Sequence, residues 1–213
     1  MTGHGFANLV VFDHPLISHK LSYLRESDTG FRPFRALMAQ IAGLMVYEVT
    51  RSFETVPVEI DTPMERTRAA RIDRKITVVP VLRAGLGMTD GVLDLMPEAR
   101  VGHLGLARDE RTFQPKAYLN KLPRDLDAGP VILVDPMLAT GGSAVAAIRM
   151  LRDAGATDLR MICLVAAPEG VRRLEDEMPD VPVYAAALDD RLDENNYIRP
   201  GLGDAGDRLF GTV

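Results

Sequence analysis

The chain of 213 residues has few of the residues that stabilise small cross-linked or metal-bound proteins. Its only cysteine, Cys163, rules out an internal disulfide, and its four histidines show no metal-ligand spacing, which excludes a structural zinc site. The longest apolar run, from Met161 to Ala167, is far shorter than the ~20 residues of a membrane span. The start of the chain, Met1–Gly5, lacks the basic and apolar regions of a signal peptide. We therefore expect a cytoplasmic protein that has no membrane partner.

An excess of positive charge is also absent. Acidic residues outnumber basic ones by 30 to 25, which gives a net charge of -5. A nonspecific nucleic-acid binder needs a positive field, so we expect no nucleic-acid partner. Hydrophobic residues make up 46% of the chain and charged residues 26%, which is the usual balance of a globular protein. No repeat and no Gly/Ser- or Pro-rich linker divides the sequence, so residues 1–213 are expected to form a single domain.

Short apolar runs alternate with helical patterns along most of the chain. Because several of these runs are nearly continuous, they indicate strands that are covered on both faces. The predicted strands are Ile76–Leu82, Val101–Leu106, Val131–Val134, Leu159–Ala166 and Val183–Ala187, and the predicted helices are Phe34–Val49, Gly87–Met96, Ser143–Ala154 and Glu169–Met178. This alternation predicts an α/β fold with a mainly parallel central sheet flanked by helices.

Residues 107–124 show no clear period beyond a possible hairpin, and residues 188–213 contain no pattern long enough for a helix. Long irregular segments in a compact domain are usually lids or binding loops, so both are candidates for the functional site. The acidic residues Asp189, Asp190, Asp193 and Glu194 fall in the second segment, and we interpret them as a loop surface rather than a metal site.

The most informative motif is Asp135-Pro-Met-Leu-Ala-Thr-Gly-Gly-Ser143, which follows the predicted strand Val131–Val134. Backbone amides of such a small-residue loop form a concave nest, and the following helix adds its dipole, so the motif favours a bound phosphate. Asp135 stands where ligands bind in open α/β sheets and suits sugar hydroxyls. The alternative is a tight turn in which Asp135 and Ser143 merely cap the helix, but the loop is longer than a cap needs. No lysine follows the glycines, which excludes a Walker loop.

A second loop, Leu82-Arg83-Ala84-Gly85, also links a predicted strand to a predicted helix. Its arginine suits multidentate phosphate contact, although alone it is equally compatible with an ordinary solvent-facing side chain. Gly201-Leu-Gly203-Asp-Ala-Gly206 fits the dinucleotide formula, but the sequence after it leaves no room for the expected helix and strand. We interpret these glycines as a loop that approaches a ligand closely.

Together these motifs resemble the uracil phosphoribosyltransferases, a family with the type I phosphoribosyltransferase fold. The resemblance covers the chain from about His14 and is carried by four segments: Leu82–Gly85, Gly105–Glu110 at the start of the lid, Asp135–Ser143, and Tyr197–Thr212. Shorter similarities lie at Ala166–Gly170 and Ala187–Arg191. The resemblance implies transfer of a phosphoribosyl group from phosphoribosyl pyrophosphate to uracil, which gives UMP and diphosphate.

The resemblance also implies roles for individual residues. The catalytic residues are expected to be Arg83, Arg108 and Asp135, with the two arginines binding the diphosphate. Uracil is expected to bind at Ile198, Gly203, Asp204 and Ala205, mainly through backbone groups. Phosphoribosyl pyrophosphate is expected to contact Arg83, Arg108, Asp135, Pro136, Met137, Leu138, Ala139, Thr140, Gly141, Gly142, Ser143 and Asp204.

The resemblance further implies Mg²⁺ as cofactor, bound mainly through the substrate's oxygens rather than by a protein metal site. It implies a homo-oligomer, a dimer or larger, and GTP as an effector in part of the family. The chain departs from the family pattern at three positions: Ala107 replaces a usual Tyr, Asn196 a usual Gly, and Arg199 an apolar residue. Asn tolerates positive φ, so we expect the turn at Asn196 to survive.

Three other functions stay open from the sequence alone. An RNA-binding pyrimidine regulator of the same fold would need a basic face, for which the only candidate is the cluster Arg66, Arg68, Arg71, Arg74 and Lys75. A transferase for another base, such as hypoxanthine or orotate, is disfavoured by Pro136 and by the C-terminal loop. An inactive α/β domain would leave the four loops unexplained.

Overall fold

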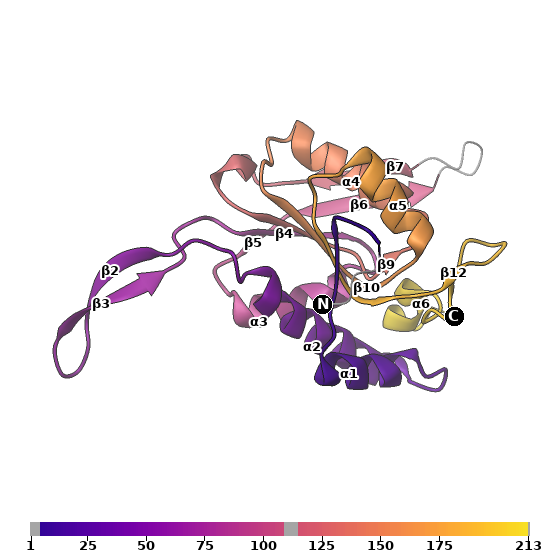
Figure 1. Ribbon diagram of the computed structural model, residues 1–213, viewed down its shortest axis with the longest axis horizontal. Helices are drawn as coiled ribbons and strands as arrows, with labels where there is room; N and C mark the ends of the chain where they lie inside the picture. Colours follow the sequence, from indigo (N-terminus) through magenta and orange to yellow (C-terminus); the bar gives the residue numbers. More distant parts are fainter. Residues whose placement is uncertain (1–4, 109–114, 213) are drawn as a thin grey trace.

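The computed structural model describes residues 5–108 and 115–212 (Figure 1). Its main sheet has the strand order β1-β11-β10-β8-β4-β6-β7, with β5 beside β4 and β9 beside β10. Within the described residues every pair in this sheet is parallel except β6 and β7, which form an antiparallel hairpin. These strands are β1 (Leu9–Val11), β4 (Thr77–Leu82), β5 (Arg100–Val101), β6 (His103–Arg108), β7 (Pro115–Lys121), β8 (Val131–Val134), β9 (Met137–Leu138), β10 (Leu159–Ala166) and β11 (Val183–Leu188).

Helices cover both faces of the sheet (Figure 1). They are α1 (Pro15–Arg25), α2 (Phe31–Val49), α3 (Leu86–Leu95), α4 (Gly142–Asp153), α5 (Pro168–Glu177) and α6 (Ala205–Phe210). In β8, Ile132 and Val134 pack with α1, α2, α3 and α6, whereas Val131 and Leu133 pack with α4 and α5. Because successive side chains alternate between the two covered faces, the central strands are apolar at nearly every position. The predicted α/β class and its mainly parallel sheet are confirmed.

Most predicted elements lie close to their observed positions. The strands β8 and β10 have the predicted bounds, and α3, α4 and α5 each begin one residue earlier than predicted. The segment predicted as Val101–Leu106 is split into β5 and β6, with the buried Gly102 between them. The structure adds α1, the short helix α6 and two small antiparallel sheets. None of the described helices has the length and apolar character needed to cross a membrane.

One small sheet is a long hairpin formed by β2 (Val56–Asp61) and β3 (Arg66–Arg71), which projects from the body of the molecule (Figure 1). The basic cluster lies on β3 and on the chain that follows it. Four of its members have carboxylate partners: Arg66 and Arg68 with Glu59, Arg74 with Asp158, and Lys75 with Asp125. This pairing weakens the positive field that the RNA-binding alternative requires.

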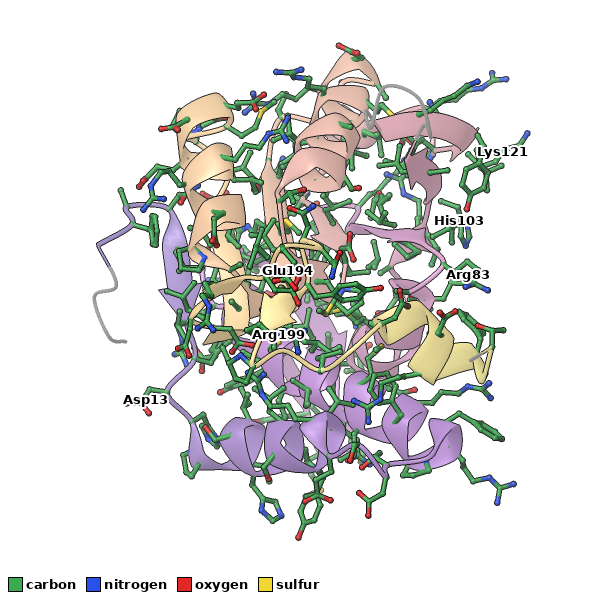
Figure 2. The ribbon with its side chains drawn as sticks, turned by 90° about the vertical axis from the view of Figure 1, so that its right-hand side faces the viewer. Asp13, Arg83, His103, Lys121, Glu194 and Arg199 are labelled. Carbon is green, nitrogen blue, oxygen red and sulfur yellow. The ribbon has the colours of Figure 1, made fainter. Side chains whose placement is uncertain are left out.

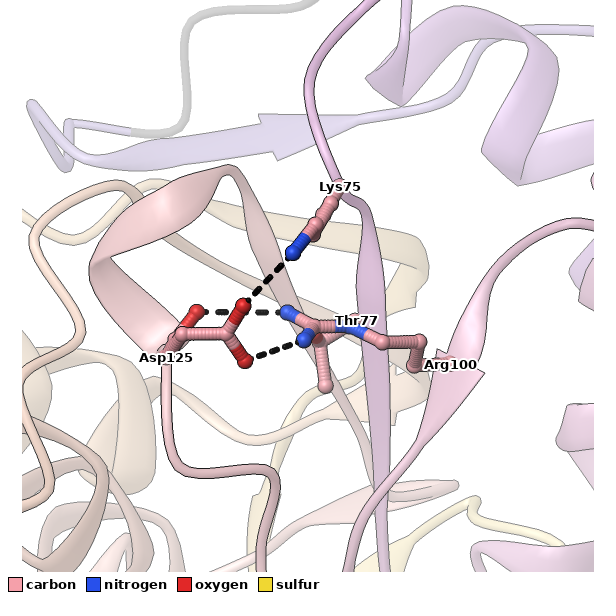
Figure 3. Close-up of polar contacts among 4 residues, drawn as sticks. All are labelled: Lys75, Thr77, Arg100 and Asp125. Carbon is pink, nitrogen blue, oxygen red and sulfur yellow. Dashed lines mark hydrogen bonds and ion pairs between the residues drawn. The ribbon is translucent and has the colours of Figure 1, made fainter.

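An ion-pair cluster fixes the amino-terminal end of β4 (Figure 3). The guanidinium of Arg100 donates to the Asp125 carboxylate, to the Asp125 carbonyl oxygen at 3.2 Å, and to the Thr77 hydroxyl at 3.1 Å. Lys75 Nζ lies 2.9 Å from Asp125 Oδ2. Hydrogen bonds from Lys75 and Arg100 lower the pKa of Asp125 to about 2. This cluster, which we call the amino-end cluster, joins the start of β4 to the chain returning from β7.

Candidate active site

The centre of the sheet has a point where the chain leaves two neighbouring strands in opposite directions. From β8 it continues through α4 to β10 on one side, and from β4 it continues through α3 to β5 and β6 on the other. Open α/β sheets bind ligands in the crevice that such a reversal leaves beyond the carboxyl ends of the strands. Asp135 follows β8 and Arg83 follows β4, so both lie at this crevice.

A cavity of about 340 Å³ occupies this position. One wall comes from the loop after β8 together with the first residues of α4, and the other comes from the C-terminal segment. The lining residues are Ala84, Asp135, Met137, Leu138, Ala139, Thr140, Gly141, Gly142, Ser143 and Ala144 on the first side, and Asn196, Tyr197, Ile198, Gly203, Asp204, Ala205 and Gly206 on the second. The cavity thus joins the sequence-predicted phosphate and base segments.

The first wall ends at the amino terminus of α4. The N-cap residue, Gly141, has φ +77°, and no side chain among the described residues caps the helix. The amides of the first turn therefore stay available to an anion, with the helix dipole behind them. The loop is pressed against α5: a Cβ built at Gly170 would lie 2.4 Å from the carbonyl oxygen of Ala139, and one at Gly141 would lie 2.9 Å from that of Gly170. Only glycines permit this close backbone packing.

Asp135 lies at the base of the cavity. Its carboxylate accepts a hydrogen bond from the Met137 amide at 3.4 Å, and no other hydrogen bond to it occurs among the described residues. Burial raises its pKa to about 7, against this weak opposing contact. The part of the side chain that stays accessible faces the cavity, so Asp135 retains acceptor capacity for a ligand.

The buried Cys163 thiol lies near Asp135. Its pKa is raised, mainly because burial desolvates the thiolate and secondarily because of the Asp135 charge. The thiol is therefore suited to packing rather than to nucleophilic chemistry.

The second wall begins with a two-stranded ribbon of β12 (Arg191–Leu192) and β13 (Ile198–Arg199). The turn between these strands is organised by Asp193, whose Oδ1 accepts from the amides of Asn195 and Tyr197, both at 2.9 Å. Asn196 adopts φ +64°, which confirms the expectation that asparagine replaces glycine in a left-handed position.

Arg199, the third departure from the family pattern, pairs with Asp193 Oδ2 at 2.5 Å. It therefore supports the turn from outside, where its side chain is largely exposed. Figure 2 shows Arg199 and Glu194 on this C-terminal segment.

The remainder of the second wall is the loop before α6. Gly201 and Gly203 have φ +65° and +78°, and Asp204 caps α6 by accepting from the Asp207 amide at 2.9 Å. The segment predicted to lack a helix thus contains a six-residue one, Ala205–Phe210. It is too short for a clear apolar periodicity.

Arg83 lies beside α6 rather than on the cavity lining (Figure 2). Its Nη2 is 3.2 Å from Asp207 Oδ1, and its guanidinium lies 5.5 Å from the Phe210 ring centre. The peptide bond between Leu82 and Arg83 is cis. Pro136 is buried, and its carbonyl oxygen accepts from the amides of Leu164 and Val165, so it too is outside the lining. Arg108 ends β6, and its side chain lies outside the described residues, as do residues 109–114 of the lid.

Sequence reasoning missed several lining residues. Ala84, Ala144, Asn196, Tyr197 and Gly206 all face the cavity, and each adjoins a predicted site residue or motif. The interpretation of the acidic run as loop surface was wrong for Asp189, which is buried with 7% exposure. It is buried because it pairs with Arg25 of α1, a contact between residues far apart in the chain.

The fold is that of known phosphoribosyltransferase structures. Over 72% of the chain it is similar, at 13% identity and a TM-score of 0.51, to the structure of a hypoxanthine-guanine phosphoribosyltransferase from Bacillus anthracis, of which 78% is covered. A family model described as uracil phosphoribosyltransferase matches residues 10–212, and the chain belongs to that family.

Two relatives cover nearly the whole chain. A uracil phosphoribosyltransferase from Macrococcus caseolyticus is 57% identical over 207 residues, which are 97% of this chain and 99% of the relative. The structure of the AQ2163 protein from Aquifex aeolicus matches with 35% identity and a TM-score of 0.92, covering 96% of this chain and 99% of that one.

Proposed function

We propose that this protein transfers the phosphoribosyl group of phosphoribosyl pyrophosphate to uracil, forming UMP and diphosphate. The observation that carries the proposal is the shared cavity, in which an uncapped helix terminus and a glycine-rich base loop face each other across Asp135. Family membership adds the identity of the base, since the relative from Macrococcus caseolyticus is named for uracil. The whole chain, residues 1–213, is proposed as one functional domain.

The cavity suggests a place for each part of the sugar-phosphate substrate. The 5′-phosphate suits the amides and hydroxyls of Ala139–Ser143, where the amino terminus of α4 supplies the positive end of its dipole. The ribose hydroxyls suit Asp135, which has free acceptor capacity. Met137 and Leu138 would contact the bound substrate from the same loop, and Pro136 would support that loop from beneath.

In this reaction a highly charged diphosphate separates from an oxocarbenium-like ribose. The main requirement on the enzyme is therefore electrostatic stabilisation of the charge that develops in the transition state. Arg83 is proposed to leave Asp207 and bind the diphosphate, assisted by Arg108 when the lid, residues 107–124, closes and excludes water.

Among the described residues no three His, Cys, Asp or Glu side chains are grouped to hold a metal. Asp135 and Asp204 offer hard oxygen donors at the cavity, which fits Mg²⁺ held mainly by substrate oxygens. When bound, Mg²⁺ would neutralise charge on the leaving diphosphate.

Uracil is proposed to lie against Ile198 and Gly203–Ala205 and to be recognised by backbone groups. Backbone N–H groups facing O2 and O4, with a carbonyl facing N3–H, would reject cytosine, because cytosine reverses the donor and acceptor pattern at N3 and C4. Asp204 lines the cavity and caps α6, and it is proposed to lie near the phosphoribosyl ligand as well as the base.

Diphosphate release with phosphoribosyl pyrophosphate and Mg²⁺, measured in parallel with uracil, cytosine, hypoxanthine and orotate, tests the proposal. We expect release with uracil alone. Release with hypoxanthine or orotate instead would replace the base assignment, and silence with all four bases despite binding of phosphoribosyl pyrophosphate would favour the regulatory alternative.

From the family resemblance we also propose a homo-oligomer, a dimer or larger, GTP as an effector, and a cytoplasmic location. Light scattering of the purified protein tests the first of these, and the same activity assay with and without GTP tests the second. A monomer, or a rate unchanged by GTP, would contradict the corresponding proposal.

A further inference from the structure

Beyond the cavity lining, a buried ion pair holds the backbone of the base loop. We infer that Arg25 and Asp189 are positioning residues for base recognition: they fix both polar backbone groups of Gly201 and thereby place the segment 198–205. This inference rests on the proposed function, since it assigns the segment to base binding.

The contacts converge on a single residue. Asp189 Oδ2 accepts from the Gly201 amide at 2.8 Å, and Arg25 Nη1 donates to the Gly201 carbonyl oxygen at 2.6 Å. The two side chains join each other through two hydrogen bonds, Nη1 to Oδ2 at 2.8 Å and Nη2 to Oδ1 at 2.5 Å. Every polar backbone group of Gly201 is therefore satisfied by a charged side chain, and such hydrogen bonds are stronger than neutral ones.

The two side chains come from rigid and distant elements. Arg25 lies in the last turn of α1, and Asp189 directly follows β11, where its own amide donates to the Ala166 carbonyl oxygen at 2.8 Å. The side chain of Asp189 is 4% exposed and that of Arg25 22% exposed. The backbone of Asp189 is hydrogen-bonded to β10, so the sheet fixes the position of the Asp189 carboxylate. The carboxylate in turn fixes the position of Gly201.

Gly201 needs such support because its own backbone is unusual. It has φ +65°, and a Cβ built on it would lie 2.1 Å from the carbonyl oxygen of Ile198. Ile198 and Gly203, on either side, both line the cavity. Recognition of a base by backbone groups requires that the backbone donors and acceptors are accurately placed. A displacement of these groups by about 1 Å weakens binding strongly in a preorganised site.

Neither Arg25 nor Asp189 lines the cavity, so neither is expected to touch a substrate. Loss of their contacts should therefore weaken base binding while leaving the phosphate loop intact. A residue needed only for folding would instead affect both substrates together.

The test compares Arg25→Lys with Arg100→Lys. Both arginines hold an aspartate, and their side chains have similar exposures of 22% and 28%, but Arg100 belongs to the amino-end cluster. Lysine keeps the charge and loses the bidentate geometry. In Arg25→Lys we expect the KM for uracil to rise about tenfold, with kcat and the KM for phosphoribosyl pyrophosphate within about twofold. In Arg100→Lys all three should stay within about twofold.

Hydrogen exchange followed by mass spectrometry provides a readout without substrate. Peptides covering 198–206 should exchange about tenfold faster in Arg25→Lys and in Asp189→Asn than in the wild type, and at the wild-type rate in Arg100→Lys. Unchanged exchange in 198–206, or equal rises in both KM values, would overturn the inference. If wild-type protein consumes no uracil the proposed function fails, whereas the exchange measurement still decides whether the pair holds the loop.

Discussion

The two ends of the central sheet carry similar arginine–aspartate clusters that hold different parts of the chain. At the amino end, Arg100, Lys75 and Asp125 bind mainly each other, and their remaining contacts fix the start of β4. At the carboxyl end, Arg25 and Asp189 place two of their hydrogen bonds on the backbone of Gly201. The first arrangement joins secondary-structure elements, and the second holds a loop in a conformation that the loop alone would not keep.

The loops at the two ends differ in the same way. At the carboxyl end, no described side chain caps the amino terminus of α4, the Asp135 carboxylate has only the long contact from the Met137 amide among the described residues, and glycines with positive φ bring the chain close to the cavity. At the amino end the charged groups bind mainly one another, although the Arg100 Nε has no hydrogen-bond partner among the described residues. The amino terminus of α4 and the Asp135 carboxylate both face a cavity, whereas the amino-end cluster joins secondary-structure elements.

Gly201→Ala should produce the largest effect. Alanine is strained in the left-handed backbone conformation of this position, and its Cβ would lie 2.1 Å from the carbonyl oxygen of Ile198, far inside van der Waals contact, so the segment 198–203 must move. We expect kcat/KM for uracil to fall about 100-fold or more. Steady-state kinetics with uracil varied at saturating phosphoribosyl pyrophosphate measures this change. Gly155→Ala, also at positive φ but with open space around it, is the matched control, and an equal loss there would contradict the assignment.

Asp135→Asn should reduce activity yet stabilise the empty protein. Loss of the charged acceptor for the ribose hydroxyls should lower kcat/KM about 10- to 100-fold. In the folded chain the pKa of Asp135 is raised to about 7. The carboxyl therefore takes up a proton on folding between about pH 4 and 7, and stability falls as the pH rises through that interval.

Asparagine stays neutral, so the variant should melt about 2–4 °C above wild type at pH 8 and at the same temperature near pH 4. Thermal unfolding followed by circular dichroism at several pH values checks this expectation. A stabilisation that does not depend on pH would show that burial of the carboxylate is not its cause.

Asp125→Asn should affect stability without affecting activity. The pKa of Asp125 is lowered to about 2, so its ionised form stabilises the fold above about pH 4, and this contribution is lost as the pH falls towards 2. We expect the variant to melt about 2 °C lower at pH 7, with kcat/KM within about twofold. The gap in melting temperature should close on acidification, and a gap that persists at pH 2 would refute the role of this charge.

Arg199→Val should have the smallest effect. The pair with Asp193 is exposed on the arginine side, and Asp193 keeps the amides of Asn195 and Tyr197 when the guanidinium is removed. We expect a melting temperature within about 1 °C of wild type and a KM for uracil within about twofold. A much larger rise in that KM would mean that the turn depends on Arg199.

The sequence predicts the buried parts of this fold well because burial imposes a pattern. Strands β8 and β10 are apolar at nearly every position, and their bounds were predicted correctly. In the hairpin, β2 alternates Val56, Val58 and Ile60 with Glu59 and Asp61, but β3 has no such alternation and both strands are largely exposed, so the hairpin was missed. Helix α1 was missed because its polar residues dilute the apolar stripe of Ile17, Leu21 and Leu24.

The sequence predicted the individual loops of the site better than the long-range contacts that hold them in place. Local motifs indicated the phosphate loop and the glycine-rich base loop, and the family resemblance indicated that they act together. The pair of Arg25 and Asp189 could not be predicted, because 164 residues separate its members and the short similarity at Ala187–Arg191 does not indicate a partner for Asp189. Only the packing of α1 against the end of β11 brings these two charges together.

The position of β1 has a consequence for the order in which the protein acquires its shape during synthesis. The register pairs Leu9 with Val183, so β1 cannot join the sheet until β11, which follows it by more than 170 residues, has been synthesised. The cavity is completed later still, by residues 196–206. The central strands β4, β8 and β10 can associate first, while the edge at β11 and the ligand-binding groups remain unformed. Until residues 196–206 are in place, one wall of the cavity is missing, so ligand binding has to follow the assembly of the central strands.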